Sequence, residues 1–364
     1  MKITHIESRI VRVPLDEPLA DGPAQKGATQ TFVTLKMGTD EGVQGLGITF
    51  FGGGTMSPAL KAAIDALGAL TIGENPLAIE AVVGKLRAAA QQSGPGGIFT
   101  LALSAIDIAL WDIRGKVFNQ PVSRLLGGFR DRVPTYASGA LMRGFPLAHI
   151  EKAAARLVEK GFRQMKTQMA LPGNTNPERE VERMRVVRNA VGPDIDVMCD
   201  INQRWDVRQA ISIGSRVEEY NLFWLEDVVA HDDYPGLAAV ADALATPIAA
   251  GEYVYGLVPF RHMLEARSVD IVMCDVLRAG GITQWMKIAG MAEAFNLPIV
   301  NHLCPEISVH LVAAAPNGLT VEYMPWSSRV FKEVPQQVNG EIAVPNKPGL
   351  GLEFDEEALK RYGA

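Results

Sequence analysis

The chain has few cysteines, only three in 364 residues. A small, odd number argues against a disulfide framework as the basis of the fold. Cys199 and Cys274 each precede an acid that we assign to the end of a strand, so alternation along the strand predicts that both thiols point away from those acids. Cys304 lies two residues after His302, but no second cysteine or paired base supports a nucleophile there. We interpret all three thiols as buried structural groups.

Long apolar runs and basic clusters are also missing. No uninterrupted apolar segment approaches the roughly 20 residues of a membrane span, and residues 1 to 7 lack the apolar core of a signal peptide. We therefore expect a cytoplasmic protein without a membrane partner. Lys and Arg total 35 against 41 Asp and Glu, a net charge of −6, which disfavours nucleic acid as a partner. The glycine clusters at 52–54 and 94–97 lack the Lys-Ser/Thr of a phosphate loop and are interpreted as ordinary loops.

The first 130 residues have the pattern of an α+β domain. Three segments have the composition of antiparallel strands, and the glycine-containing turn at 38–42 separates the second from the third. Three segments with helical period follow, two of which begin with proline. The expected strands cover residues 3–13, 31–37 and 43–49, and the expected helices cover 58–70, 76–90 and 101–117. We expect this domain, residues 1–130, to cap the rest of the chain.

From residue 131 to 325 strands and helices alternate. Eight expected strands with seven intervening helices predict a modified (β/α)7β barrel of the TIM type. The strands are expected near 134–138, 163–167, 195–200, 222–226, 247–252, 270–275, 298–302 and 319–322. After Glu322 the chain is rich in proline and shows no full amphipathic helix, so the eighth helix is expected to be absent or replaced. The tail, residues 326–364, should return to the capping domain, with residues 350–352 packing there.

Three acids recur at a fixed interval, since Asp200, Glu226 and Glu252 are each 26 residues apart. Each ends or directly follows a short apolar run, which indicates a buried parallel strand. Because the carboxyl ends of the strands share one face of a barrel, the three carboxylates should converge on one cation. Three oxygen donors with no His or Cys alongside favour Mg²⁺ over Zn²⁺, with Mn²⁺ as the alternative.

Other polar side chains stand at the ends of the remaining strands. In chain order, the predicted mouth of the barrel carries Lys166, Asp200, Glu226, Glu252, Asp275, His302 and Glu322. Asp275 and His302 end successive strands, so the carboxylate should hold one imidazole nitrogen and leave the other for proton transfer. We expect a general acid/base pair at these two residues and structural roles for the other histidines.

The motifs around these residues resemble those of the enolase superfamily, in its mandelate racemase subgroup, over nearly the whole chain. In the first domain the matching residues are Ala109-Leu110-Trp111-Asp112 with Gly115-Lys116. In the barrel they are Gly161-Phe162-Arg163-Gln164-Met165-Lys166, Asp200-Ile201-Asn202-Gln203, Trp224-Leu225-Glu226-Asp227, Gly251-Glu252, Asp275 with Gly280-Gly281-Ile282-Thr283, Asn301-His302-Leu303, Glu306-Ile307-Ser308 and Glu322.

The resemblance implies an activity and a cofactor. The three acids would bind Mg²⁺, and a base would remove the proton α to a substrate carboxylate. Lys166 would add positive charge, while Glu322, in its protonated form, would donate to the other carboxylate oxygen. Asn202 would contact the substrate hydroxyl. The resemblance also implies a homo-oligomer, an octamer or a dimer.

One departure from the family pattern concerns the second strand of the barrel. The family has Lys-x-Lys, in which the second Lys is the base on the face opposite the histidine, but this chain has Lys166-Thr167-Gln168. An amide has no basic lone pair, so we place Gln168 with the substrate-binding residues. His302 is then the remaining base. It can take the C2 proton and protonate a departing 3-hydroxyl, which predicts syn dehydration of an acid sugar to a 2-keto-3-deoxy acid.

Two alternatives stay open at this point. The first is isomerisation, either epimerisation or lactone cycloisomerisation of a 2-hydroxy acid with His302 as the base. The second is a Mg²⁺-dependent acid-sugar binding protein that has lost catalysis together with the second Lys.

Substrate specificity should come from the loops at 21–27 and 50–55 of the first domain. Lys26 and Arg143 are candidates for binding a distal carboxylate, which would suit an aldaric acid, although each is also readily explained as a solvated charge. Phe50 is instead a candidate for contact with an apolar group. The substrate is therefore expected to be an aldonic or aldaric acid.

Overall fold

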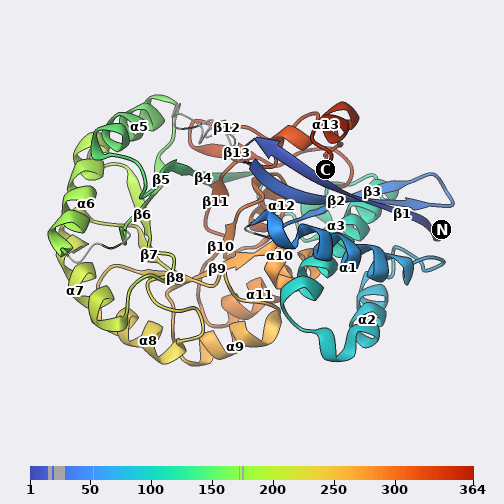
Figure 1. The fold of residues 1–364 in the computed structure, drawn as a ribbon, viewed down its shortest axis with the longest axis horizontal. Helices are drawn as coiled ribbons and strands as arrows, with labels where there is room; N and C mark the ends of the chain where they lie inside the picture. The colour runs from blue at the N-terminus through green and yellow to red at the C-terminus, as the bar shows by residue number, and fades with distance from the viewer. Residues whose placement is uncertain (15–18, 20–28, 52, 172, 174–175) are drawn as a thin grey trace.

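The computed structural model describes residues 1–14, 19, 29–51, 53–171, 173 and 176–364 of the chain. In Figure 1 a ring of helices surrounds a set of strands on the left, and a sheet with its own helices lies on the right. Lys26 and the rest of the loop at 21–27 lie outside the described residues, as does Gly52 in the loop at 50–55.

The first domain is an antiparallel sheet covered by three helices, as predicted. Its strands follow one another in the sheet order β1-β2-β3. They are β1 (Ile3–Pro14), β2 (Thr29–Thr39) and β3 (Gln44–Thr49), and the helices are α1 (Ser57–Ala69), α2 (Ile79–Ala90) and α3 (Gly97–Val117). The prediction placed the start of α2 three residues too early. The Asn75 side chain accepts from the N–H of Leu77 at 3.0 Å, and this local turn holds Pro76 outside the helix.

Helix α3 lies between the small sheet and the barrel, and its close approach to β3 depends on two glycines. A Cβ at Gly45 would lie 2.3 Å from the carbonyl oxygen of Ala109, and one at Gly47 would lie 2.0 Å from that of Ala105. Any side chain at these positions would push the helix off the sheet. The two glycines therefore allow an almost fully buried helix to carry the sheet against the barrel.

Eight parallel strands form the barrel, with seven helical segments between them. Strand β11 pairs with β4, and the segment just before β11 bridges to β10 through Gly318 and Ile299, which closes the ring. The strands are β4 (Arg132–Leu141), β5 (Gln164–Gln168), β6 (Asp196–Asp200), β7 (Trp224–Glu226), β8 (Ile248–Ala250), β9 (Ile271–Asp275), β10 (Ile299–His302) and β11 (Val321–Tyr323). The helices are α5 (Leu147–Glu159), α6 (Pro177–Val191), α7 (Val207–Val217), α8 (Tyr234–Ala243), α9 (Leu257–Glu265), the pair α10 (Val276–Ala279) and α11 (Ile282–Ala294), and α12 (Pro305–Ala314). The predicted (β/α)7β barrel with a capping domain is confirmed.

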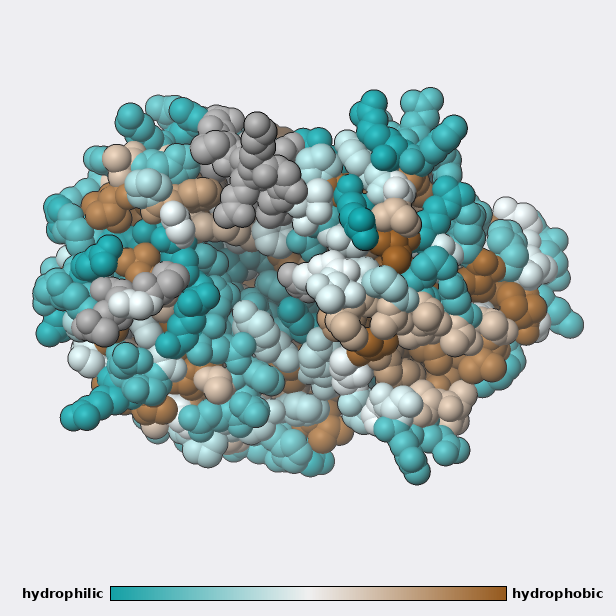
Figure 2. Space-filling model, viewed as in Figure 1, coloured by the Kyte–Doolittle hydropathy of each residue, from teal (hydrophilic) through white to brown (hydrophobic). Residues whose placement is uncertain are grey.

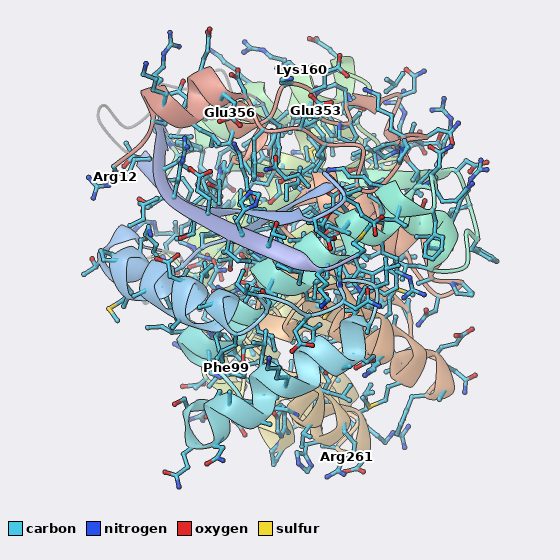
Figure 3. All side chains as sticks on the ribbon, turned by 90° about the vertical axis from the view of Figure 1, so that its right-hand side faces the viewer. Arg12, Phe99, Lys160, Arg261, Glu353 and Glu356 are labelled. Carbon is cyan, nitrogen blue, oxygen red and sulfur yellow. The ribbon has the colours of Figure 1, made fainter. Side chains whose placement is uncertain are left out.

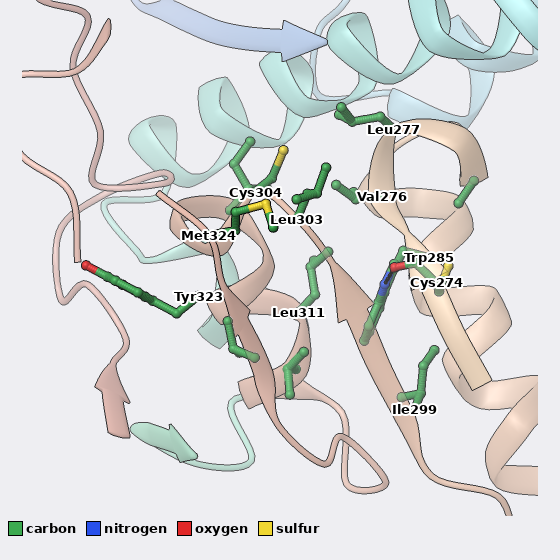
Figure 4. Packing of buried hydrophobic residues seen from close by; sticks show 14 of the residues in the cluster. Cys274, Val276, Leu277, Trp285, Ile299, Leu303, Cys304, Leu311, Tyr323 and Met324 are labelled. Carbon is green, nitrogen blue, oxygen red and sulfur yellow. Dashed lines mark hydrogen bonds between the residues drawn. The ribbon is translucent and has the colours of Figure 1, made fainter. Parts of the chain in front are cut away.

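Two apolar cores stabilise the barrel. One fills its interior and consists of Tyr136, Met198, Trp224, Ala249, Ile271, Met273 and Val300. The other, much larger, lies between the strands and the helices and extends into the first domain. Cys199 and Cys274 belong to this outer core, as the alternation along their strands predicts. Figure 4 shows Cys274 beside Trp285 in this outer layer.

The C-terminal tail contacts the barrel first and then the first domain. Its hairpin, β12 (Gln337–Val338) and β13 (Glu341–Ala343), pairs with the start of β4, a contact that the sequence analysis did not predict. The chain then returns to the first domain, as expected, where the Leu350 N–H donates to Asp112 at 2.9 Å. In Figure 3 the last helix, α13 (Glu356–Arg361), lies beside the small sheet, and Glu356 forms an ion pair with Lys36 on β2.

Among the described residues, none of the helices combines the length and the apolar composition that a membrane crossing requires.

Candidate active site

The polar residues predicted at the strand ends lie together at the carboxyl end of the barrel. Parallel pairing sets Asp200 opposite both Gln168 and Glu226, and Asp275 opposite His302. A cavity of about 350 Å³ at the mouth opens toward the first domain and is lined by six of these side chains: Lys166, Gln168, Asp200, Glu252, His302 and Glu322. Its remaining lining includes Gln30, Phe50, Ser138, Gly139, Leu141, Met142, Asn202, Arg278, Leu303, Met324 and Trp326. Figure 2 shows hydrophilic residues around a hollow in the left half of the molecule, inside the ring of helices.

Four buried carboxylates lie at the mouth, and three of them form a tight group. Oxygens of Glu226, Asp227 and Glu252 lie within 4.8 Å of one another. Asp200 is not part of that tight group, because its carboxylate is turned toward the Asn202 N–H at 2.7 Å and the Gln168 amide at 3.3 Å. Two sets of three acids are therefore candidates for a metal site. Both contain Glu226 and Glu252, and the third member is either Asp200 or Asp227.

The charge state of these acids suits a divalent cation. Burial raises the pKa of both Asp200 and Glu226, and the neighbouring carboxylate of Glu252 raises both further. Burial likewise raises the pKa of Asp227, which has the same acidic neighbours. Crowded carboxylates without a His or Cys in the group have the chemistry of a site for Mg²⁺, which prefers oxygen ligands and offsets their mutual repulsion.

Lys166 is buried between two of the acids. Its Nζ lies 2.6 Å from Glu226 Oε1 and 2.8 Å from Glu322 Oε1. Burial acts to lower its pKa, but these two carboxylates outweigh burial and raise it, so the side chain is an ammonium ion. The ring of Tyr136 lies below it, 5.6 Å from Nζ.

Glu322 is a carboxylate in this arrangement, which differs from the protonated form that we expected. Its Oε2 accepts a hydrogen bond from the Leu303 N–H at 2.6 Å. Burial acts to raise its pKa, but the positive charges of Lys166 and His302 outweigh burial and lower it. Donation from Glu322 to a bound carboxylate would therefore require a proton that this arrangement does not favour.

Asp275 and His302 form a hydrogen-bonded pair. His302 Nδ1 lies 2.7 Å from Asp275 Oδ2, while the other carboxylate oxygen of Asp275 accepts the N–H groups of Leu277 at 2.7 Å and Arg278 at 2.9 Å. Asp275 therefore caps helix α10 and holds the imidazole at once. Nε2 points to the cavity side, 3.3 Å from Glu252 Oε2. Burial acts to lower the pKa of His302, but the surrounding carboxylates, Glu252 first, raise it to about 9.

Gln168 lies on the opposite side of the cavity from the histidine, within a network of amides. Its Nε2 donates to Asn202 Oδ1 at 3.2 Å, and its Oε1 accepts from the Arg143 N–H at 3.2 Å. The Arg143 guanidinium donates to Asn202 Oδ1 at 2.6 Å and to the Met169 carbonyl at 2.8 Å. The guanidinium is thus bonded to protein oxygens, an arrangement that suits holding Asn202 in place better than binding a distal carboxylate.

Several residues that line the cavity were not predicted from the sequence, among them Arg278 and Ser138. Arg278 donates to the Glu252 carbonyl at 2.9 Å and to Asp275 Oδ2 at 3.2 Å, and its position three residues after Asp275 could have indicated it. Ser138 on β4 is buried, and its hydroxyl has no hydrogen-bond partner among the described residues. A serine in a strand is common, so no sequence signal would have identified it.

Family models match most of the chain in two segments. Residues 6–127 match the mandelate racemase / muconate lactonizing enzyme N-terminal domain. Residues 149–358 match the enolase C-terminal domain-like model. The first segment corresponds to most of the small sheet with its helices, and the second to the barrel after β4 with most of the tail.

Individual relatives match over the full length. The chain is 30% identical to an L-talarate/galactarate dehydratase of Salmonella typhimurium, over 99% of this chain and 90% of that protein. It is 30% identical to a 3,6-anhydro-alpha-L-galactonate cycloisomerase of Streptomyces coelicolor, over 99% of both. The crystal structure of an L-talarate dehydratase from a Polaromonas species, complexed with Mg and L-glucarate, superposes with a TM-score of 0.92 at 30% identity, covering 100% of this chain and 97% of that one. The chain belongs to the mandelate racemase/muconate lactonizing enzyme family of the enolase superfamily.

Proposed function

We propose that this protein is a Mg²⁺-dependent acid-sugar dehydratase in which His302 is the base. The observation that carries the proposal is the asymmetry of the cavity. One side presents the imidazole of His302, held by Asp275 at 2.7 Å, and the other side presents the amide of Gln168. A single base that removes the C2 proton and returns it to a leaving group on the same face is sufficient for syn dehydration.

The roles of the other residues follow from their positions. Asp200, Glu226 and Glu252 would hold Mg²⁺, which supplies positive charge to the substrate carboxylate as negative charge develops there. Lys166 would bind an oxygen of the substrate carboxylate, and Glu322, whose Oε1 lies 2.8 Å from Nζ, would orient the ammonium group. Asn202, held by Arg143, would contact a substrate hydroxyl.

The reaction balances with His302 as the only proton carrier. Mg²⁺ bound at Glu252 would offset the carboxylate charge that raises the pKa of His302, which makes the neutral imidazole available as a base. Its Nε2 accepts the proton from C2 as the C2–H bond breaks. The bond between C3 and its hydroxyl then breaks, and the imidazolium donates its proton so that water leaves. The resulting enol tautomerises to a 2-keto-3-deoxy acid, and His302 is neutral again for the next turnover.

The outer wall of the cavity favours an aldonic acid over an aldaric acid. The described residues that line it away from Lys166 and the acids are neutral: Gln30, Phe50, Met142, Met324 and Trp326. A second carboxylate placed there would lose hydration without gaining a cation from any of these side chains. A hydroxyl or a methyl terminus has no such cost, and the Gln30 amide can bond a hydroxyl.

The test is to incubate the purified protein and Mg²⁺ with a panel of aldonic and aldaric acids and to measure keto-acid release as the semicarbazone absorbance. We expect release from at least one aldonic acid, abolished by chelator and restored by added Mg²⁺. If no member of a broad panel yielded a keto acid, the dehydratase assignment would be wrong. Release from aldaric acids alone would overturn only the preference for an aldonic acid.

A second candidate function, lactone cycloisomerisation, is supported by the similarity to the Streptomyces coelicolor cycloisomerase. It too would use His302 at C2, but the substrate would rearrange without loss of water. Mass spectrometry separates the two functions, because dehydration lowers the product mass by one water and isomerisation leaves it unchanged.

A further inference from the structure

We propose that Trp224 is a positioning residue that fixes the carboxylate of Glu226 for the cation, an inference that rests on the proposed function of the acids at the barrel mouth. The indole Nε1–H donates to Glu226 Oε2 at 3.0 Å. Trp224 begins strand β7 and Glu226 ends it, so the two side chains, two residues apart, point into the barrel on the same side of the strand.

The indole itself is held rigidly. Trp224 is fully buried in the core that fills the barrel interior. Its ring meets Tyr136 edge to face, with centroids 5.5 Å apart and an interplanar angle of 87°. A large ring in a close-packed interior has one accessible rotamer, so its N–H has a fixed direction. The indole N–H therefore fixes the orientation of the Glu226 carboxylate from the barrel interior, because the packed ring cannot move with the carboxylate.

Glu226 receives a donor on each oxygen, and the two donors differ in kind. Lys166 bonds Oε1 at 2.6 Å, but this ammonium is also needed for the substrate carboxylate and is mounted on a flexible stem. The Trp224 indole has one donor, no acceptor and no charge. When a substrate draws Lys166 away, Trp224 remains to keep the second oxygen in place. Partners of this kind typically account for 10- to 100-fold in metal affinity.

The indole of Trp224 should also report the binding of a cation at Glu226. Placing a divalent cation on Glu226 changes the electric field at an indole that is hydrogen-bonded to the same carboxylate. The emission of Trp224 should therefore respond to Mg²⁺, with no substrate and no turnover involved. The chain has five tryptophans, so variants are needed to assign the response.

The experiment compares Trp224→Phe with a matched control, Trp285→Phe. Trp285 is also fully buried, and its indole also donates one hydrogen bond, at 3.1 Å, but the acceptor is the backbone carbonyl of Cys274 in the outer core (Figure 4). Both changes remove one buried indole and one bond. Mg²⁺ is titrated into each metal-free protein, following binding by calorimetry and tryptophan emission, with circular dichroism to verify folding.

We expect Trp224→Phe to bind Mg²⁺ about 10- to 100-fold more weakly than the wild type and to lose most of the emission change, while Trp285→Phe retains both. Equal affinity and an unchanged emission response in folded Trp224→Phe would overturn the inference and leave the dehydratase proposal standing. A wild type that bound no Mg²⁺ would overturn both. If Trp224→Phe does not fold, the Mg²⁺ titration is followed instead in ¹⁵N spectra of the wild-type indole N–H groups. Variants at the other four tryptophans assign the signal of Trp224. A Trp224 signal unmoved by Mg²⁺ would then contradict the inference.

Discussion

Lys166 and Glu226 form a buried ion pair, with Nζ 2.6 Å from Oε1. Lys166 is the cation expected to bind the substrate, and Glu226 is one of the acids expected to bind the metal. The pair stabilises the site while neither ligand is bound. However, Lys166 competes with the metal for Glu226, and Glu226 competes with the substrate carboxylate for Lys166. Loading the site should therefore separate the two side chains.

The first prediction concerns Lys166→Met. The substitution removes a positive charge beside the acids, so Mg²⁺ should bind as tightly as in the wild type or up to about tenfold more tightly. Turnover should fall by at least about a thousandfold, because the charge that stabilises the substrate carboxylate is lost. Calorimetry and the keto-acid assay measure the two effects. Much weaker Mg²⁺ binding would mean that Lys166 supports the metal site instead of competing with it.

The second prediction separates the two sets of acids at the mouth. If Asp200 is a metal ligand and Asp227 is a buried neighbour, Asp200→Asn should weaken Mg²⁺ binding by at least about a hundredfold and Asp227→Asn by no more than about tenfold. Each variant changes one buried carboxylate to an amide of equal size, so each serves as the control for the other. The reverse order of affinities would move the metal site to Glu226, Asp227 and Glu252, whose oxygens already lie within 4.8 Å of one another.

The sequence predicted that Asp200, Glu226 and Glu252 lie at the mouth because each of these acids ends or follows a short apolar run. Asp200 and Glu226, for instance, could be placed side by side from their positions at the ends of successive strands, without knowledge of any tertiary contact. Asp227 could not be placed, since its backbone has φ of 44° and its side chain therefore does not follow the alternation of the strand. The two-residue spacing of Trp224 and Glu226 was visible, but that the indole would donate to the carboxylate depends on the packing of the barrel interior.

Other features depended on contacts between distant segments. The short strands β12 and β13 are two and three residues long, too short for a periodic pattern to indicate them. The ionised state of Glu322 depends on Lys166 and His302, which come from two other strands. Arg143 was a candidate for binding a distal carboxylate or a solvated charge, and its bond to Asn202 could not be predicted because it needs the loop after β4 to fold over the end of β6.

The third prediction concerns Ser138→Ala. The hydroxyl is buried at the cavity wall and has no hydrogen-bond partner among the described residues, so a bound substrate is its natural partner. Losing one neutral hydrogen bond should lower kcat/KM by about five- to tenfold, roughly 1 kcal/mol. Ser57→Ala is the control, because that hydroxyl is equally buried and without a partner in the described part of the chain but does not line the cavity. Equal effects of the two substitutions would contradict a substrate contact.

The fourth prediction is a loss of stability in acid caused by His310. Its ring is fully buried, with Nδ1 accepting the Ser123 N–H at 3.3 Å and Nε2 donating to the Leu350 carbonyl at 3.0 Å. Both nitrogens are satisfied in the neutral form, and burial lowers the pKa from 6.5 to about 4. The unfolded chain therefore takes up a proton near pH 6.5 while the folded chain does not. Stability from this group is complete above about pH 6.5 and falls as the pH drops toward 4.

The size of this effect is about 3 kcal/mol between pH 6.5 and 4, from about 1.4 kcal/mol per pKa unit. His310→Gln keeps a donor for Leu350 but cannot be protonated, so its free energy of unfolding should vary less with pH over this interval. His262→Gln, at an exposed histidine, should retain the wild-type dependence. Denaturant unfolding at several pH values measures all three. The same slope in His310→Gln and the wild type would show that His310 is not responsible.

In the proposed mechanism one base, His302, acts on one face of the substrate. The most direct test is to follow the reaction in D₂O by ¹H NMR with a substrate from the keto-acid screen, comparing the wild type with His302→Asn and Gln168→Ala. We predict a 2-keto-3-deoxy product from the wild type, product from Gln168→Ala at a rate within about tenfold, and at least a thousandfold slower formation by His302→Asn. Product formation by His302→Asn at the wild-type rate, or its loss in Gln168→Ala alone, would contradict the account.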